Sequence, residues 1–140
     1  ITGGGFKATT DPVLWAIYAP STPEFGPIET PEIPIMLTPK AAHNIYFQVL
    51  GSSGFVGLFI FLTMMMTGFL SSLKNARVAK KNNIVWAYRL SSAISLSFIA
   101  YGITGINVSL AYFELVYALL AIVIALGGIL KHSISSRETL

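Results

Sequence analysis

The chain has 140 residues, of which 54% are hydrophobic and only 11% are charged, with a formal net charge of +3. Soluble domains carry about 25% charged residues, so this composition excludes an ordinary water-soluble globular domain. The absence of cysteine excludes disulfides, zinc–thiolate sites, iron–sulfur clusters and covalently attached c-type haem. No arginine-rich face interleaved with aromatic residues is present, so nothing supports nucleic-acid binding.

Residues 1–43 are predicted to form a proline-rich segment outside the membrane. All seven prolines precede Lys40, and each removes a backbone donor and fixes φ. We expect extended, polyproline-like chain from Pro20 to Pro39. Its apolar side chains are too many for a solvated linker, so we interpret it as a strap that lies on another surface. Before the strap, Asp11 and Pro12 predict the start of a short helix at the membrane interface.

Residues 44–132 are predicted to form a domain of three membrane-spanning helices. An uncharged stretch of about 20 residues is long enough to cross the hydrocarbon core of a bilayer. The spans are expected at residues 44–73, 84–105 and 110–130. A basic loop over residues 74–83 and a tight reversal over residues 105–109 connect them, and residues 133–140 are expected to be a polar tail. The predicted fold is an all-α integral membrane protein, with three transmembrane helices and an extended proline-rich N-terminal segment.

The distribution of basic residues predicts the orientation in the membrane. The first loop is strongly basic, whereas the N-terminal third has more acidic than basic residues. The basic residues of the loop are Lys74, Arg77, Lys80 and Lys81. Because positive loops stay on the cytoplasmic or stromal side, we expect the C-terminus there and the N-terminus outside or in the lumen. The chain begins at Ile1 rather than Met, from which we expect that a targeting segment has been removed.

Each predicted span carries one face of small residues when successive residues are placed 100° apart. Helices in lipid associate through close packing of small residues rather than through hydrophobicity. We therefore expect other integral membrane subunits, together with membrane lipids, to pack against these faces. The faces are Gly51, Gly54 and Gly57 on the first span, Ser91, Ser95 and Gly102 on the second, and Ala118, Ala121 and Ala125 on the third.

Four side chains are candidates for a single axial bond to the magnesium of a chlorophyll-type pigment. They are His43, Gln48, Glu114 and His132. The predicted topology puts the two histidines on opposite membrane faces, so they cannot hold one haem between them. The alternative interpretation is that the histidines are ordinary interfacial residues and that Glu114 is an interfacial carboxylate.

Motifs for catalysis and metal binding are missing from the sequence. It contains no glycine-rich phosphate loop, no His-Glu-x-x-His and no plausible Ser–His–acid set. We therefore expect no enzyme activity, no catalytic residues and no metal site.

The sequence favours a small accessory subunit that stabilises a multisubunit energy-converting membrane complex. A processed terminus and single pigment ligands favour a photosynthetic, thylakoid membrane over a respiratory one. We expect no cofactor intrinsic to the chain, and chlorophyll, carotenoid or lipid as the molecules it would contact. The alternative is a protomer of a small oligomeric transporter or channel. That function needs a polar face through the bilayer middle, for which Ser91, Ser95 and Thr104 are too few.

Overall fold

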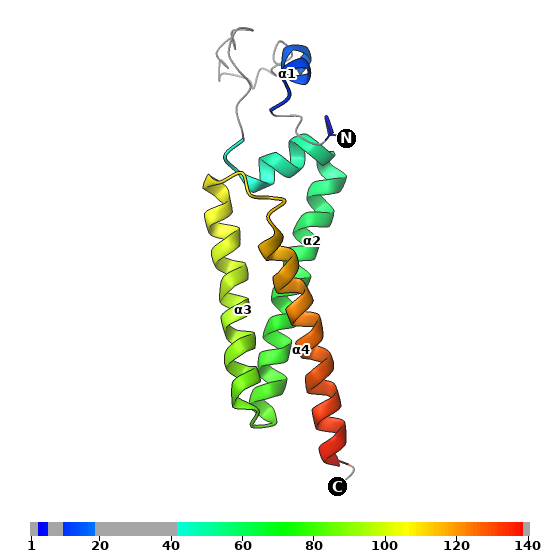
Figure 1. Cartoon of the computed structure of the whole chain (residues 1–140), viewed down its shortest axis with the longest axis vertical. Helices are drawn as coiled ribbons and strands as arrows, with labels where there is room; N and C mark the ends of the chain where they lie inside the picture. The colour runs from blue at the N-terminus through cyan, green and yellow to red at the C-terminus, as the bar shows by residue number, and fades with distance from the viewer. Residues whose placement is uncertain (1–2, 6–9, 19–41, 139–140) are drawn as a thin grey trace, which may run out of the picture. The chain divides into compact units, whose positions relative to one another are not determined.

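The computed structural model describes residues 3–5, 10–18 and 42–138, and every regular element in these ranges is a helix (Figure 1). The helices are α1 (Pro12–Tyr18), α2 (Ile45–Lys81), α3 (Val85–Thr104), the short 3-10 helix η2 (Gly105–Asn107) and α4 (Glu114–Glu138). Three of them, α2, α3 and α4, are long and apolar enough to cross a membrane. The predicted class, an all-α protein with three transmembrane helices, is confirmed. The proline-rich strap over residues 20–39 lies outside the described residues.

Contacts divide the chain into two compact units, which are described separately. The first unit comprises Ile1–Phe59 together with Ile106–Ala111, and the second comprises Ile60–Gly105 together with Tyr112–Leu140. The first unit therefore contains α1, the start of α2 and the connection that follows α3. The second unit contains the rest of α2 with α3 and α4.

The helix start predicted at Asp11 and Pro12 is confirmed by α1. The Oδ1 atom of Asp11 accepts hydrogen bonds from the backbone N–H groups of Val13 and Leu14, at 2.8 and 3.1 Å. The first N–H groups of a helix have no partner inside it, so this carboxylate satisfies two of them. Pro12 has no N–H and its fixed φ suits the first helical position.

Gly54 interrupts α2 near its start. Its angles, φ 67° and ψ −167°, lie in a region open essentially to glycine alone, and α2 bends here (Figure 1). A bond from residue i to residue i−4 needs helical residues between them, so the bend frees the carbonyls just before Gly54. The N–H of Gly4 donates to the carbonyl of Gly51 at 2.8 Å, and that of Gly5 donates to Ser52 at 3.0 Å. The N-terminal glycine segment thus satisfies carbonyls that a bilayer would leave unpaired.

The expected loop over residues 74–83 is wrong, because α2 continues to Lys81. No glycine or proline lies between Gly68 and Gly102, and this stretch is rich in alanine, lysine and arginine, which favour helix. The positive charges therefore mark the polar end of a long helix rather than a break in it.

Asn83 ends α2 through a Schellman motif. Its φ of 56° is left-handed, its N–H donates to the carbonyl of Lys80 at 3.2 Å, and the N–H of Ile84 donates to Ala79 at 2.9 Å. Asparagine tolerates this conformation, and the two bonds satisfy carbonyls at the helix end. The hydrophobic contact typical of the motif is present, because Ile84 and Ala79 belong to one buried cluster.

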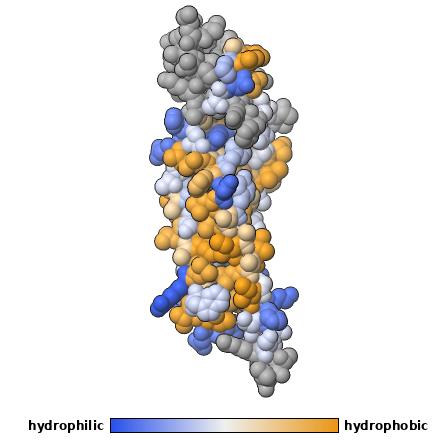
Figure 2. Space-filling model, in the orientation of Figure 1, coloured by the Kyte–Doolittle hydropathy of each residue, from blue (hydrophilic) through white to orange (hydrophobic). Residues whose placement is uncertain are grey.

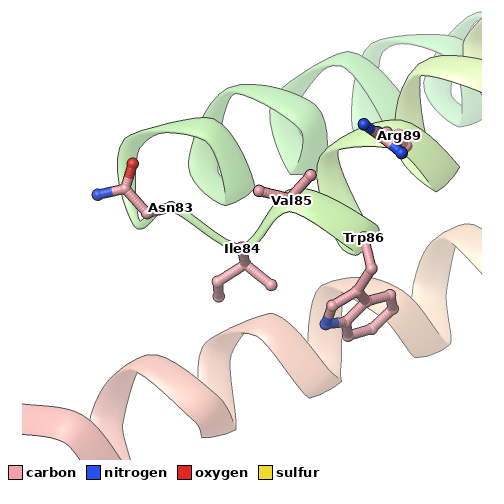
Figure 3. A pocket seen from close by; sticks show the side chains of 5 residues that line it. All are labelled: Asn83, Ile84, Val85, Trp86 and Arg89. Carbon is pink, nitrogen blue, oxygen red and sulfur yellow. The ribbon is translucent and has the colours of Figure 1, made fainter.

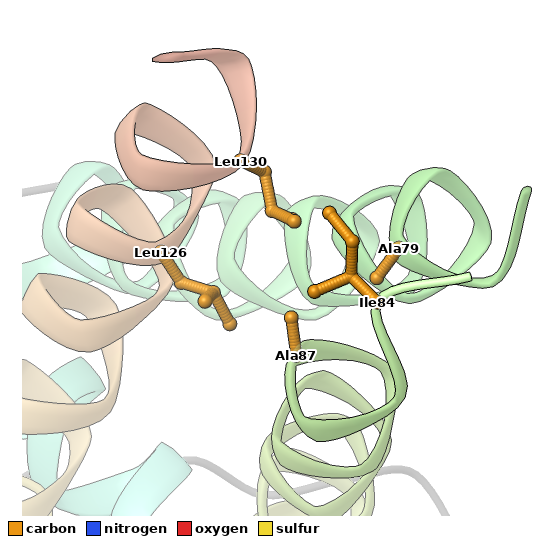
Figure 4. Close-up of a cluster of buried hydrophobic side chains, with 5 residues drawn as sticks. All are labelled: Ala79, Ile84, Ala87, Leu126 and Leu130. Atoms are coloured by element: carbon orange, nitrogen blue, oxygen red, sulfur yellow. The ribbon is translucent and has the colours of Figure 1, made fainter. Parts of the chain in front are cut away.

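The buried cluster of the second unit joins the end of α2, the start of α3 and the later part of α4. Its five apolar side chains, each at most 7% exposed, point toward one another (Figure 4). They are Ala79, Ile84, Ala87, Leu126 and Leu130. A polar contact adds to this packing, since the Nδ2 atom of Asn75 donates to the carbonyl of Val123 at 3.0 Å. Close packing therefore holds the three helices of this unit together, and the bond from Asn75 of α2 to the backbone of α4 adds to it.

The third span begins and ends later than predicted. It is expected from Leu110, but residues 108–113 are not helical and α4 begins at Glu114. The N–H of Ala111 donates instead to Oε1 of Gln48, and residues 106–111 belong to the first unit. Glu114 in the first turn suits the positive end of the helix dipole. At the other end, residues 133–138 of the predicted polar tail are helical.

Candidate functional site

Two of the four candidate ligands, His43 and Gln48, come together in the first unit. His43 lies two residues before α2 and Gln48 lies in its first turn, and both bond to the connection between α3 and α4. We call this place the His43 junction and define it by His43, Asn44, Gln48, Ser109 and Ala111. Each of these residues takes part in at least one hydrogen bond there.

His43 has a fixed, unusual backbone and an exposed side chain. Its φ is 45°, and among the described residues only Asn83 shares a positive φ without being glycine. Its N–H donates to the Oγ atom of Ser109 at 2.7 Å. The next residue, Asn44, caps α2, because its Oδ1 accepts the N–H groups of Tyr46 and Phe47 at 2.9 and 3.1 Å. Residues in sparsely populated backbone regions cluster at functional sites, so this histidine is the strongest of the four candidates.

Gln48 serves the structure of the junction. Its Oε1 accepts the N–H of Ala111 at 3.1 Å, and Ala111 has no exposed surface. Ile45 and Val49, one turn apart on α2, are also buried. The oxygen that would bind a magnesium ion is therefore engaged in holding the connection against α2. Pigment binding by Gln48 stays a prediction and would require this bond to be shared.

Glu114 and His132 lie apart from each other in the second unit. Both are exposed on α4, Glu114 at its first residue and His132 near its end. At 1.5 Å per residue they are about 27 Å apart along the helix, so one small ligand cannot contact both. Each remains a single candidate ligand. No group of three or more His, Cys, Asp or Glu residues that could hold a metal ion occurs within the described ranges.

An exposed imidazole at the His43 junction can offer one nitrogen ligand to a metal-centred molecule. The bond from the His43 N–H to Ser109 Oγ and the bond from the Ala111 N–H to Gln48 Oε1 hold the backbone from which the imidazole extends. This arrangement provides a binding point rather than a complete catalytic set.

Sequence reasoning missed the parts of the junction that come from the connection after α3. The sequence predicts no role for Ser109 beyond its place in the reversal over residues 105–109. The bend at Gly54 was interpreted as part of a packing face, although Gly3, Gly4 and Gly5 in one run are a signal for close backbone approach. Both features depend on contacts between residues about 50 or more positions apart in the chain.

The three predicted small-residue faces have different surroundings. On α2, Gly51 and Gly54 belong to the bend bonded by the N-terminal glycines. On α3, Ser91 and Ser95 are buried inside the second unit, and the Oγ of Ser91 has no hydrogen-bond partner. On α4, the whole face is exposed. Its residues are Ala118, Ala121, Ala125 and the following Gly128. Only the α4 face is thus uncovered along its length.

No family model, no curated protein and no solved structure matches this chain.

Proposed function

We propose that this chain is a non-catalytic membrane module that packs against further membrane helices in a larger complex. The observation that carries the proposal is the small-residue face of α4, which stays exposed while the comparable face of α3 is buried by the chain's own helices. The α4 face consists of Ala118, Ala121, Ala125 and Gly128. A Cβ placed on Gly128 would meet no atom within 4 Å.

The amount of buried surface supports this reading. In each spanning helix only 28% to 33% of the most apolar stretch is buried by the chain itself. Apolar side chains cover much of the visible face of the helices (Figure 2). Lipid can cover large apolar residues, but a flat row of small residues gives lipid chains few contacts and lets a helix backbone approach closely. A further helix is therefore a better occupant of the α4 face than lipid.

The finer part of the proposal is an accessory role in an energy-converting complex, with a photosynthetic membrane preferred. Its support is the set of single candidate ligands, of which His43 is the best placed. Chlorophyll or carotenoid would then be bound at the edge of the chain rather than enclosed by it. The proposed orientation puts α1 and the His43 junction outside or in the lumen, and the end of α2 on the cytoplasmic or stromal side.

The alternative is a protomer of a small oligomeric transporter or channel. It requires polar side chains along one face through the bilayer middle. The buried polar side chains of the described residues are Ser52, Ser72, Ser91 and Ser95. The hydroxyls of Ser72 and Ser95 donate to backbone carbonyls of their own helices. Such mild groups give an ion or polar solute few ligands, so the packing module is preferred.

The test of the main proposal is native separation of the source membrane in mild detergent. The chain should migrate with companion membrane proteins, and visible absorbance in that fraction would support the pigment part. Ala121→Leu with Ala125→Leu should release the chain from the complex, because bulky side chains hold helix backbones apart. Ala100→Leu, on an exposed position of α3, is the matched control. Migration of the unaltered chain alone would refute the proposal.

A second candidate function, single-point ligand binding by His43, rests on the strained and exposed geometry of that residue. His43→Asn is the informative variant, because asparagine tolerates positive φ and so removes the imidazole while keeping the backbone. The expected result is loss of bound pigment with unchanged assembly. Pigment retained by this variant would assign His43 to structure alone.

A further inference from the structure

Five exposed cations surround the turn between α2 and α3. They are Lys74, Arg77, Lys80, Lys81 and Arg89. No Asp or Glu occurs from residue 33 to residue 113, so neither α2 nor α3 contains a carboxylate to offset these charges. A surface with this much uncompensated positive charge attracts anions.

The four cations of α2 lie on one side of the helix. At 100° per residue they fall in a sector of about 120°, on the side away from the buried Ala76 and Ala79. Lys80 reaches toward the next helix, since its Nζ lies 5.9 Å from the ring centroid of Tyr88. This contact brings the positive charge of α2 to Tyr88, the residue before Arg89 in α3.

An open hollow of about 690 Å³ lies at this turn (Figure 3). It is lined by Asn83, Ile84, Val85, Trp86 and Arg89. The guanidinium of Arg89 can form paired hydrogen bonds to phosphate oxygens. Val85 and Trp86 are 58% and 55% exposed, and they offer an apolar wall beside that charge. One cationic group next to apolar and aromatic side chains matches a molecule with a phosphate at one end and hydrocarbon at the other.

The position of the hollow favours a lipid over a soluble anion. Two spanning helices meet here, and exposed Trp86 and Tyr88 are the residue types that lie at headgroup level. We propose that this surface binds the phosphate of an anionic phospholipid, with Arg89 as its main contact and Lys80 and Lys81 adding attraction. Every residue named here belongs to the second unit.

Trp86 provides a direct probe of the site. The chain has two tryptophans, so Trp15→Phe leaves Trp86 as the only one. The full chain is placed in phosphatidylcholine nanodiscs, and Trp86 emission is followed as dibrominated phosphatidylglycerol or dibrominated phosphatidylcholine is added, because bromine quenches tryptophan on contact. Quenching should reach its midpoint at a several-fold lower mole fraction of the anionic lipid. The preference should fall in 1 M salt, where the Debye length is about 3 Å.

Three variants test the assignment to these residues. Each basic residue near an anionic surface contributes about 1 kcal/mol, so Arg89→Gln should reduce the preference about fivefold, and Lys80→Gln with Lys81→Gln should reduce it further. Lys131→Gln is the matched control, since it removes an exposed cation from α4. If Lys131→Gln reduced the preference for anionic lipid as much as Arg89→Gln, the net charge of the chain would explain the preference, and the proposed site would be overturned. Equal quenching by the two lipids, or full competition by millimolar inorganic phosphate, would also overturn it.

Discussion

Replacing Gly54 with alanine should straighten α2 and release the N-terminal glycine segment. An L-residue in the left-handed helical region already costs about 1–2 kcal/mol of conformational free energy. The angles of Gly54, φ 67° and ψ −167°, lie in a region that is less favourable still for any residue with a Cβ. Alanine also favours regular helix over glycine by about 1 kcal/mol. In a straight helix the carbonyls of Gly51 and Ser52 bond to residues 55 and 56 and are closed to Gly4 and Gly5.

The magnitude follows from these opposing contributions. Alanine at position 54 destabilises the bent form by about 2–3 kcal/mol, whereas the two bonds from Gly4 and Gly5 stabilise that form by about 1 kcal/mol each. The straight form loses these two bonds but gains two bonds within α2 in their place, so it should be the more stable form. Protection of the Gly4 and Gly5 amides from exchange should then fall by about 30-fold or more, since 1.4 kcal/mol is a factor of ten.

Amide hydrogen exchange measured by NMR on ¹⁵N-glycine-labelled protein is suited to this prediction. The chain has only 12 glycines, so the spectrum is simple. Gly128→Ala is the matched control, because a Cβ there meets nothing within 4 Å and α4 should gain slightly in stability. Gly3→Ala should release the segment without straightening α2, because its Cβ would clash with the backbone of Ser52 and Ser53. Unchanged protection of Gly4 and Gly5 in Gly54→Ala would refute the link between the bend and the glycine segment.

Four further predictions concern the second unit and the orientation. Gly68→Ala should destabilise the protein by about 1–3 kcal/mol, because its Cβ would lie 2.6 Å from Phe98 Cζ and Leu120 Cδ2; helix loss in an SDS titration measures this. Asn75→Leu should cost about 0.6 kcal/mol or more in the same titration, through loss of the 3.0 Å bond to Val123. Asn83→Gly should leave stability nearly unchanged, whereas Asn83→Val should cost about 1–2 kcal/mol because its φ is 56°; equal effects would argue against the Schellman end. Lys81→Cys, in a chain with no other cysteine, should react with a membrane-impermeant maleimide only from the cytoplasmic or stromal side, and labelling from the other side would reverse the proposed orientation.

The regular parts of the fold could be predicted because they depend on neighbours in the sequence. Apolar runs long enough to cross a bilayer identify α2, α3 and α4, and the cap at Asp11 identifies α1. The end of α2 was placed too early because charge was interpreted as a loop signal. Helix propensity and the absence of glycine or proline after Gly68 were the better guides, and Asn83 marks the real end.

The candidate site could be predicted only residue by residue. The sequence predicts His43 and Gln48 as ligand candidates five residues apart, but it does not predict which part of the chain they contact. Those contacts are with Ser109 and Ala111, which lie more than 60 positions later in the chain. Contacts of this kind leave no periodic trace in a single sequence, because each requires only one donor and one acceptor.

Residues with positive φ occur in both units, but different contacts hold them in place. In the second unit, Asn83 has a positive φ that a standard helix end explains in full, and its neighbours form a buried core. In the first unit, Gly54 and His43 also depart from ordinary backbone. Distant parts of the chain bond to His43 itself and to the carbonyls of Gly51 and Ser52, just before Gly54. Such bonds keep a strained conformation in place only if the surrounding chain is held as well. We therefore expect specific ligand binding in the first unit, at the exposed imidazole of His43. In the second unit, we propose that the exposed α4 face serves assembly with other membrane helices.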